Sequence, residues 1–112
     1  MSNIKVKFVN LSLQFESLKP EIMSKIASVM KSGDYILGSE VREFEMNFAK
    51  YCDCKYAVGV ANGTDALFLS MKALGIGSGD EVITAPNSFI STAGAIIAAG
   101  AKPVFADVGD DY

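Results

Sequence analysis

The sequence predicts an α/β protein in which helices cover the faces of a parallel sheet. From residue 56 onward the apolar pattern alternates strand, helix, strand, helix, strand. That order favours parallel strands joined by right-handed crossovers. Apolar residues make up 50% of the 112 residues, so the chain can form a core, and its length allows one small domain at most.

Residues 1–55 are expected to form an amino-terminal helical segment, after a weakly alternating, extended stretch at residues 4–9. A first helix is predicted from about Pro20 to Lys31, with Gly33 as its stop. A loop bounded by Gly33 and Gly38 follows, and Ser39 is expected to cap a second helix. The apolar residues at helical spacing are Ile22, Ile26, Val29 and Met30 in the first helix, and Val41, Phe44, Phe48 and Tyr51 in the second.

Residues 56–112 are expected to begin an α/β domain. Buried helices are predicted because their apolar residues lie nearly all round. The expected elements are strands at residues 56–60, 81–84 and 103–106, and helices at residues 64–74 and 89–99, the second ending at Gly100.

Composition excludes several classes of function. The net charge of −3 gives no basic footprint for nucleic acid and no basic helix for a membrane surface. The apolar runs are too short for a transmembrane helix, and no signal peptide opens the chain, so a cytoplasmic protein is expected. Cys52 and Cys54 have C-x-C spacing and there is no His, so neither a metal site nor a His-based catalyst is expected.

The turn Asn62-Gly63-Thr64-Asp65 lies between an expected strand and an expected helix. Ligands of parallel α/β sheets collect at such strand ends, and the free amides of a helix start favour a phosphate. Gly63 allows close approach, and Thr64 adds a hydroxyl donor. Ordinary capping by Asn62 or Thr64, with Asp65 complementing the helix dipole, explains the same residues, and spacing alone slightly favours it.

Neither common phosphate loop is present. There is no G-x-x-x-x-G-K-[ST] motif, and Gly75-x-Gly77-x-Gly79 follows a helix and precedes a strand, the reverse of a dinucleotide-binding fingerprint. Phe89 leaves its strand at the same sheet end as Gly63. It is either a lid on a flat ligand or a core residue, and general burial preferences favour the core.

Taken together, these segments resemble the sugar aminotransferases of the DegT/DnrJ/EryC1/StrS family, which are pyridoxal 5'-phosphate (PLP) enzymes. The resemblance covers nearly the whole chain, and its ordered set of segments is specific. It implies the three-layer α/β/α fold of the PLP-dependent transferases (aspartate aminotransferase fold type I), here the amino-terminal part of the large domain. The matching segments are Gly33–Gly38, Phe44-Glu45, Phe48-Ala49, Asn62–Leu67, Ala73–Gly77, Gly79–Ile83, Ser88-Phe89 and Gly100–Val108.

The resemblance also implies roles for individual residues. The backbone of Gly63 and Thr64, with the Thr64 hydroxyl, would hold the PLP phosphate, and Phe89 would stack on the pyridine ring. Tyr35 would lie beside the nucleotide-sugar substrate. The implied reaction moves an amino group, usually from glutamate, to a nucleotide-linked keto-sugar, in a homodimeric enzyme.

No catalytic residue is assigned within the chain. In relatives, the Schiff-base lysine and the acidic partner of the pyridine nitrogen lie beyond the matched region. Lys72 is interpreted as the polar edge of its helix and Lys102 as a solvated turn residue. The chain is therefore expected to be the amino-terminal portion of a longer enzyme and inactive alone. A non-catalytic fragment that binds a phosphate ligand or a partner, or an inert truncated product, are the alternatives.

Overall fold

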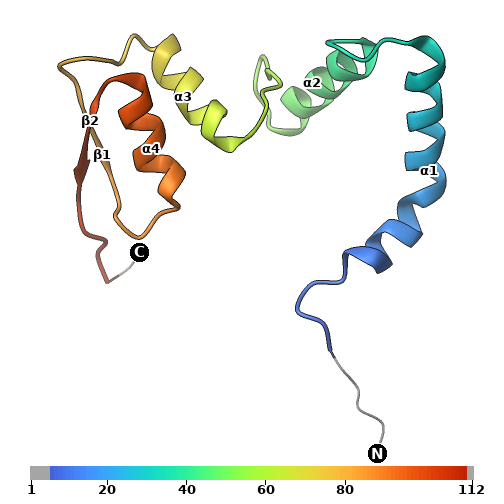
Figure 1. The fold of residues 1–112 in the computed structure, drawn as a ribbon, viewed down its shortest axis with the longest axis horizontal. Coiled ribbons are helices and arrows are strands. Elements are labelled where there is room, and N and C mark those ends of the chain that lie inside the picture. The colour runs from blue at the N-terminus through green and yellow to red at the C-terminus, as the bar shows by residue number, and fades with distance from the viewer. Residues whose placement is uncertain (1–5, 111–112) are drawn as a thin grey trace, which may run out of the picture. The chain divides into compact units, whose positions relative to one another are not determined.

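The computed structural model describes residues 6–110, which form four α-helices and two β-strands (Figure 1). Contacts between residues divide the chain into two units, residues 1–57 and 58–112, and each is described by itself. The elements are α1 (Leu11–Ser32), α2 (Ser39–Tyr51), α3 (Gly63–Ala73), β1 (Glu81–Thr84), α4 (Ile90–Ala99) and β2 (Lys102–Phe105).

Helix α1 begins at Leu11, well before the predicted start at Pro20. Apolar residues at helical spacing continue upstream of Pro20, and the Asn10 side chain accepts a hydrogen bond from the Leu13 amide at 3.4 Å. Pro20 lies inside the helix, where it removes one backbone donor. The predicted stop at Gly33 is confirmed by its φ of 75°. Residues 4–5 of the expected extended stretch lie outside the described residues, and residues 6–9 form no strand.

Helix α2 begins at Ser39 as its first helical residue, so the prediction that Ser39 is the cap is wrong. Gly38 occupies the N-cap position and no side chain caps the helix. A side chain does not fit at Gly38, because an added Cβ would lie 2.6 Å from the Asp34 carbonyl oxygen. The expected apolar face forms, with ring centroids 5.5 Å apart for Phe44 and Phe48.

In the second unit, β1 and β2 pair in parallel, with Glu81 opposite Lys102 and Thr84 opposite Phe105. The Ala106 amide extends the ladder by donating to the Thr84 carbonyl at 3.0 Å. Helix α4 connects the two strands and packs against both, as Figure 1 shows. The strand predicted at residues 81–84 is confirmed, and β2 begins one residue before its predicted start.

The strand predicted at residues 56–60 does not form. Tyr56 and Val58 are 73% and 78% exposed, so this stretch is not buried either. A strand needs a neighbour for its ladder, and within residues 6–110 the sheet consists of β1 and β2 alone. Residues 56–60 have a composition typical of a strand, but a local sequence pattern carries no information on whether a neighbouring strand is present to pair with.

The core of the second unit is centred on α4, whose Ile96 is 2% exposed. Gly100, with φ 91°, ends α4 as predicted, in the left-handed conformation that glycine adopts readily. The prediction that the preceding helix is also buried is wrong, because no residue of α3 is buried. Helix α3 packs against α4, and the sheet that would cover its other side does not extend that far within the described residues. The other buried apolar residues of this unit are Ala95, Ala99 and Ala101.

Candidate functional site

An open pocket of about 370 Å³ lies where the amino-terminal ends of α3 and α4 meet. Pockets for small molecules generally have volumes of about 300–1,000 Å³. Three of the residues that the sequence singled out, Gly63, Thr64 and Phe89, line this one pocket. Its remaining lining residues are Asn62, Leu67, Ser91 and Thr92.

The start of α3 leaves two backbone amides available to this pocket. The Asn62 side chain accepts from the Asp65 amide at 2.9 Å, and the Asn62 carbonyl accepts from the Ala66 amide at 3.0 Å. The amides of Gly63 and Thr64 come before these in the helix, and no acceptor is found for them within residues 6–110. The helix dipole adds partial positive charge at the same place, so the amides favour an anion.

Two further details make room for an anion there. A Cβ added to Gly63 would meet no atom of the described residues within 4 Å, so the space in front of its backbone is open. The Asp65 carboxylate, which would repel an anion, is not part of the pocket lining. The negative charge of Asp65 therefore lies outside the pocket lining.

Phe89 is 76% exposed, so the prediction that it is a core residue is wrong. It occupies the N-cap of α4 with an extended backbone, and its carbonyl accepts from the Thr92 amide at 2.9 Å. The Ser88 and Thr92 hydroxyls, on either side of it, are hydrogen-bonded at 2.9 Å. An exposed ring on a backbone held in this way is available to cover a flat ligand.

Ser91 and Thr92 are lining residues that the sequence analysis missed. They occupy the first turn of α4, directly after Phe89. The usable signal was a second helix start, placed by the sequence at the same end of the expected sheet as the Gly63 turn. Each of the two residues adds a hydroxyl group to the pocket wall, which can donate to a ligand.

Tyr35 belongs to the other unit and is not a lining residue of this pocket. Its ring is 67% exposed, and its hydroxyl donates to the Met30 carbonyl at 3.3 Å. The ring is thus accessible to a ligand, although the hydroxyl already has an acceptor within the chain.

Neither lysine considered above lines the pocket. The Lys72 ammonium donates to the Ala99 carbonyl at 3.3 Å, near the end of α4. Lys102 is not a turn residue, since it opens β2 and its ammonium lies 2.7 Å from a Glu81 carboxylate oxygen. That hydrogen bond and the charge of Glu81 raise the pKa of Lys102. Both lysines therefore have structural partners.

Two other features of the described residues bear on the site. Cys52 and Cys54 are free and exposed, and no three acidic, Cys or His side chains in residues 6–110 cluster closely enough to hold a metal ion. No helix of the same range is long and apolar enough to cross a membrane.

Comparison with known protein families shows which family the chain is related to. The model of the DegT/DnrJ/EryC1/StrS aminotransferase family matches residues 16–112. The chain belongs to this family. The resemblance inferred from the sequence is thereby confirmed.

Similarity to individual curated proteins supports the same family relationship. Over 103 residues the chain is 48% identical to the "Pleiotropic regulatory protein" of Geobacillus stearothermophilus, covering 92% of this chain and 28% of the relative. Over 108 residues it is 44% identical to the dTDP-3-amino-3,4,6-trideoxy-alpha-D-glucose transaminase of Streptomyces venezuelae, covering 96% of this chain and 28% of the relative. The chain thus spans little more than a quarter of the length of these relatives.

Solved structures confirm the predicted fold. The S. venezuelae DesV structure superposes with a TM-score of 0.93 at 44% identity, covering 96% of this chain and 29% of that one. NtdA of Bacillus subtilis, solved with the bound cofactor PMP, gives a TM-score of 0.88 at 29% identity over 97% of this chain and 25% of its own. The chain has the fold of part of a fold type I, PLP-dependent transferase.

Proposed function

We propose that the chain is the amino-terminal part of a PLP-dependent aminotransferase that acts on a nucleotide-linked keto-sugar. An amino acid, with glutamate as the expected one, donates the amino group, and the product serves amino-sugar or polysaccharide biosynthesis. Relatives named as transaminases of dTDP- and UDP-linked sugars support the substrate class. The full-length enzyme is a cytoplasmic homodimer in this proposal.

The pocket at Gly63, Thr64 and Phe89 is the observation that carries the proposal. The two available amides and the Thr64 hydroxyl hold the cofactor phosphate through charge-assisted hydrogen bonds. Phe89 covers one face of the pyridine ring by offset stacking. Bound PLP supplies an electron sink for the transfer, and these residues bind and orient it.

This chain carries no catalytic residue in the proposal. The lysine that bonds to PLP would lie in the part of the full-length enzyme that this chain does not cover. Lys72 and Lys102 are engaged with Ala99 and Glu81, which supports leaving them out of the chemistry. The 112 residues alone are expected to be inactive.

The proposal is tested with the full-length polypeptide that carries this chain. With PLP, glutamate and a panel of dTDP- and UDP-linked keto-sugars, it should form an amino-sugar nucleotide and 2-oxoglutarate, both measurable by mass spectrometry. Phe89→Leu should weaken PLP binding, whereas Phe105→Leu, at a phenylalanine also exposed but outside the pocket, should not. Absence of transfer with every sugar nucleotide, while PLP binds, would refute the substrate class.

A further inference from the structure

The loop between α1 and α2, residues 33–38, presents large side chains to the surroundings. Tyr35, Ile36 and Leu37 are 67%, 84% and 70% exposed. Exposed apolar side chains on a loop commonly mark a binding surface when the loop is held in one shape. The contacts around this loop show that it is held.

The loop backbone is constrained at three points. Gly33 has φ 75° and Leu37 has φ 49°, so a leucine occupies the left-handed region that side chains disfavour. Gly38 is closely packed against the Asp34 carbonyl. Unfavourable conformations of this kind persist only where surrounding contacts hold them, and they cluster at ligand sites.

Side chains hold the loop from both helices. The Arg42 guanidinium of α2 donates to the Leu37 carbonyl at 3.0 Å, the very residue with the unfavourable φ. From the α1 side, the Tyr35 hydroxyl donates to the Met30 carbonyl, and the Ser32 hydroxyl accepts from the Asp34 amide at 3.2 Å.

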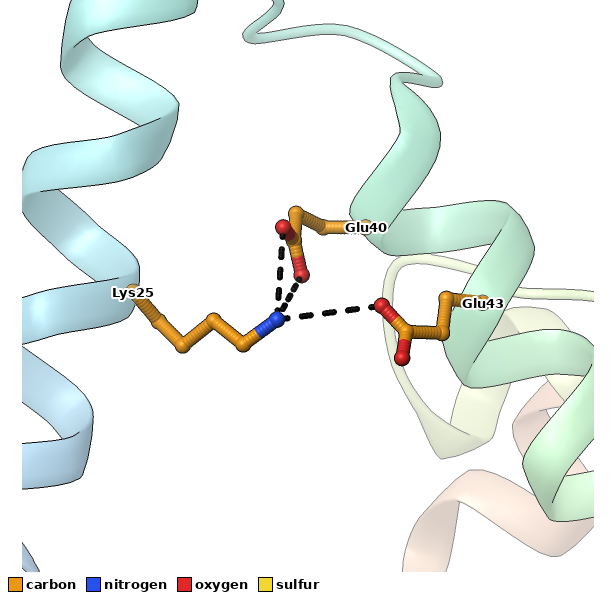
Figure 2. A network of polar contacts seen from close by, with 3 residues as sticks. All are labelled: Lys25, Glu40 and Glu43. Atoms are coloured by element: carbon orange, nitrogen blue, oxygen red, sulfur yellow. Dashed lines mark hydrogen bonds and ion pairs between the residues drawn. The ribbon is translucent and has the colours of Figure 1, made fainter.

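The two helices are also tied to each other. The Lys25 ammonium of α1 lies 3.1 Å from a Glu40 carboxylate oxygen and 3.7 Å from a Glu43 carboxylate oxygen of α2. Figure 2 shows the Lys25 side chain extending toward both carboxylates. The hydrogen bond and charge of Glu40 raise the pKa of Lys25. The loop is therefore anchored on two helices that these ion pairs link to each other.

We propose that Arg42 is a positioning residue for the nucleotide-linked substrate, because it holds the Leu37 carbonyl and thereby fixes Tyr35 against that substrate. This inference rests on the proposed function. An aromatic ring beside two exposed aliphatic side chains suits the flat base or the sugar face of a nucleotide-sugar. The three side chains offer no charge to bind the two carboxylates of glutamate. A loop fixed before binding also lowers the entropy lost when the substrate is ordered.

The test separates the two half-reactions of the full-length enzyme. In Arg42→Gln, KM for the nucleotide keto-sugar should rise on the order of tenfold, since small misplacements in a site have effects of this size or larger. The half-reaction with glutamate is followed by the change in cofactor absorbance. Its rate should stay within about twofold of wild type, because the misplaced loop side chains do not bind glutamate. Arg42→Lys keeps one donor and should restore part of the lost KM. Lys50→Gln, which removes a positive charge at the other end of α2, is the matched control.

Tyr35→Phe gives a second, milder variant that keeps the ring and removes the bond to Met30. It should raise the same KM by a smaller factor. An active wild type whose sugar KM is unchanged in Arg42→Gln would overturn the positioning role, as would equal losses in both half-reactions of Arg42→Gln and Arg42→Lys. A wild type that transfers no amino group to any nucleotide keto-sugar would instead refute the proposed function.

Discussion

Replacing Gly63 with alanine separates the two roles that its position can have. If Gly63 is only the first residue of a helix, alanine should be harmless or favourable. A Cβ there meets nothing within 4 Å among residues 6–110. Alanine in a helix is more stable than glycine by up to about 1 kcal/mol. On structural grounds alone, Gly63→Ala should therefore leave the free energy of unfolding unchanged or raise it slightly.

If the backbone of Gly63 meets the cofactor phosphate, the added methyl group projects into the pocket that Gly63 lines. The phosphate then loses at least one hydrogen bond that a neutral backbone amide donates to its charged oxygens. Such a bond is worth about 1.5–3 kcal/mol. Since about 1.4 kcal/mol corresponds to a factor of ten, PLP should bind on the order of ten- to a hundredfold more weakly.

The assay is equilibrium binding to the full-length apoprotein, with PLP and with pyridoxal, which lacks the phosphate. Gly63→Ala should lose affinity for PLP and little for pyridoxal. Gly94→Ala is the matched control, because Gly94 lies in α4, outside the pocket lining, and its Cβ would also meet no described atom within 4 Å. Equal affinity of wild type and Gly63→Ala for PLP, or equal losses for PLP and pyridoxal, would refute close approach of the phosphate to this backbone.

Three further predictions concern stability. Ile96→Ala should lower the free energy of unfolding by about 2–5 kcal/mol, because it leaves a cavity in place of the one large side chain of α4 that is buried among the described residues; chemical denaturation measures this, and a loss under 1 kcal/mol would contradict it. Asn62→Ala should cost about 0.5–2 kcal/mol through the lost bond to the Asp65 amide, and Asn62→Asp should recover most of it in the same measurement. Because Glu81 raises the pKa of Lys102 above its ordinary 10.5, the ion pair stabilises the fold fully below that value and loses its effect as pH rises through the raised pKa. Stability of Lys102→Met should therefore fall less steeply above pH 10.5 than that of wild type, and identical pH profiles would contradict this.

The elements that the sequence predicted well are those whose signals are local. The strand at residues 81–84 has β-branched residues between a glycine-rich turn and a proline, and the end of α4 is set by Gly100. In both cases the deciding residues lie within the element or next to it.

The failures occurred where distant or competing residues decide. Residues 56–60 have the composition of a strand, but pairing depends on a neighbour that no local pattern reveals. The first helix was predicted to start at about Pro20, yet it begins at Leu11, because apolar residues at helical spacing continue upstream of Pro20. The loss of one backbone donor at Pro20 does not end the helix.

The capping and the anion-binding interpretations of the turn that begins at Asn62 are compatible in the structure. Asn62 caps α3 through the Asp65 amide, which is the capping interpretation. That bond, with the one from Ala66 to the Asn62 carbonyl, satisfies the later amides of the first turn and leaves those of Gly63 and Thr64 facing no acceptor in the described part of the chain. Capping therefore does not compete with an anion here: it fixes the helix start and orients the two amides that an anion needs. Spacing could not distinguish the interpretations, because the same residues suit both.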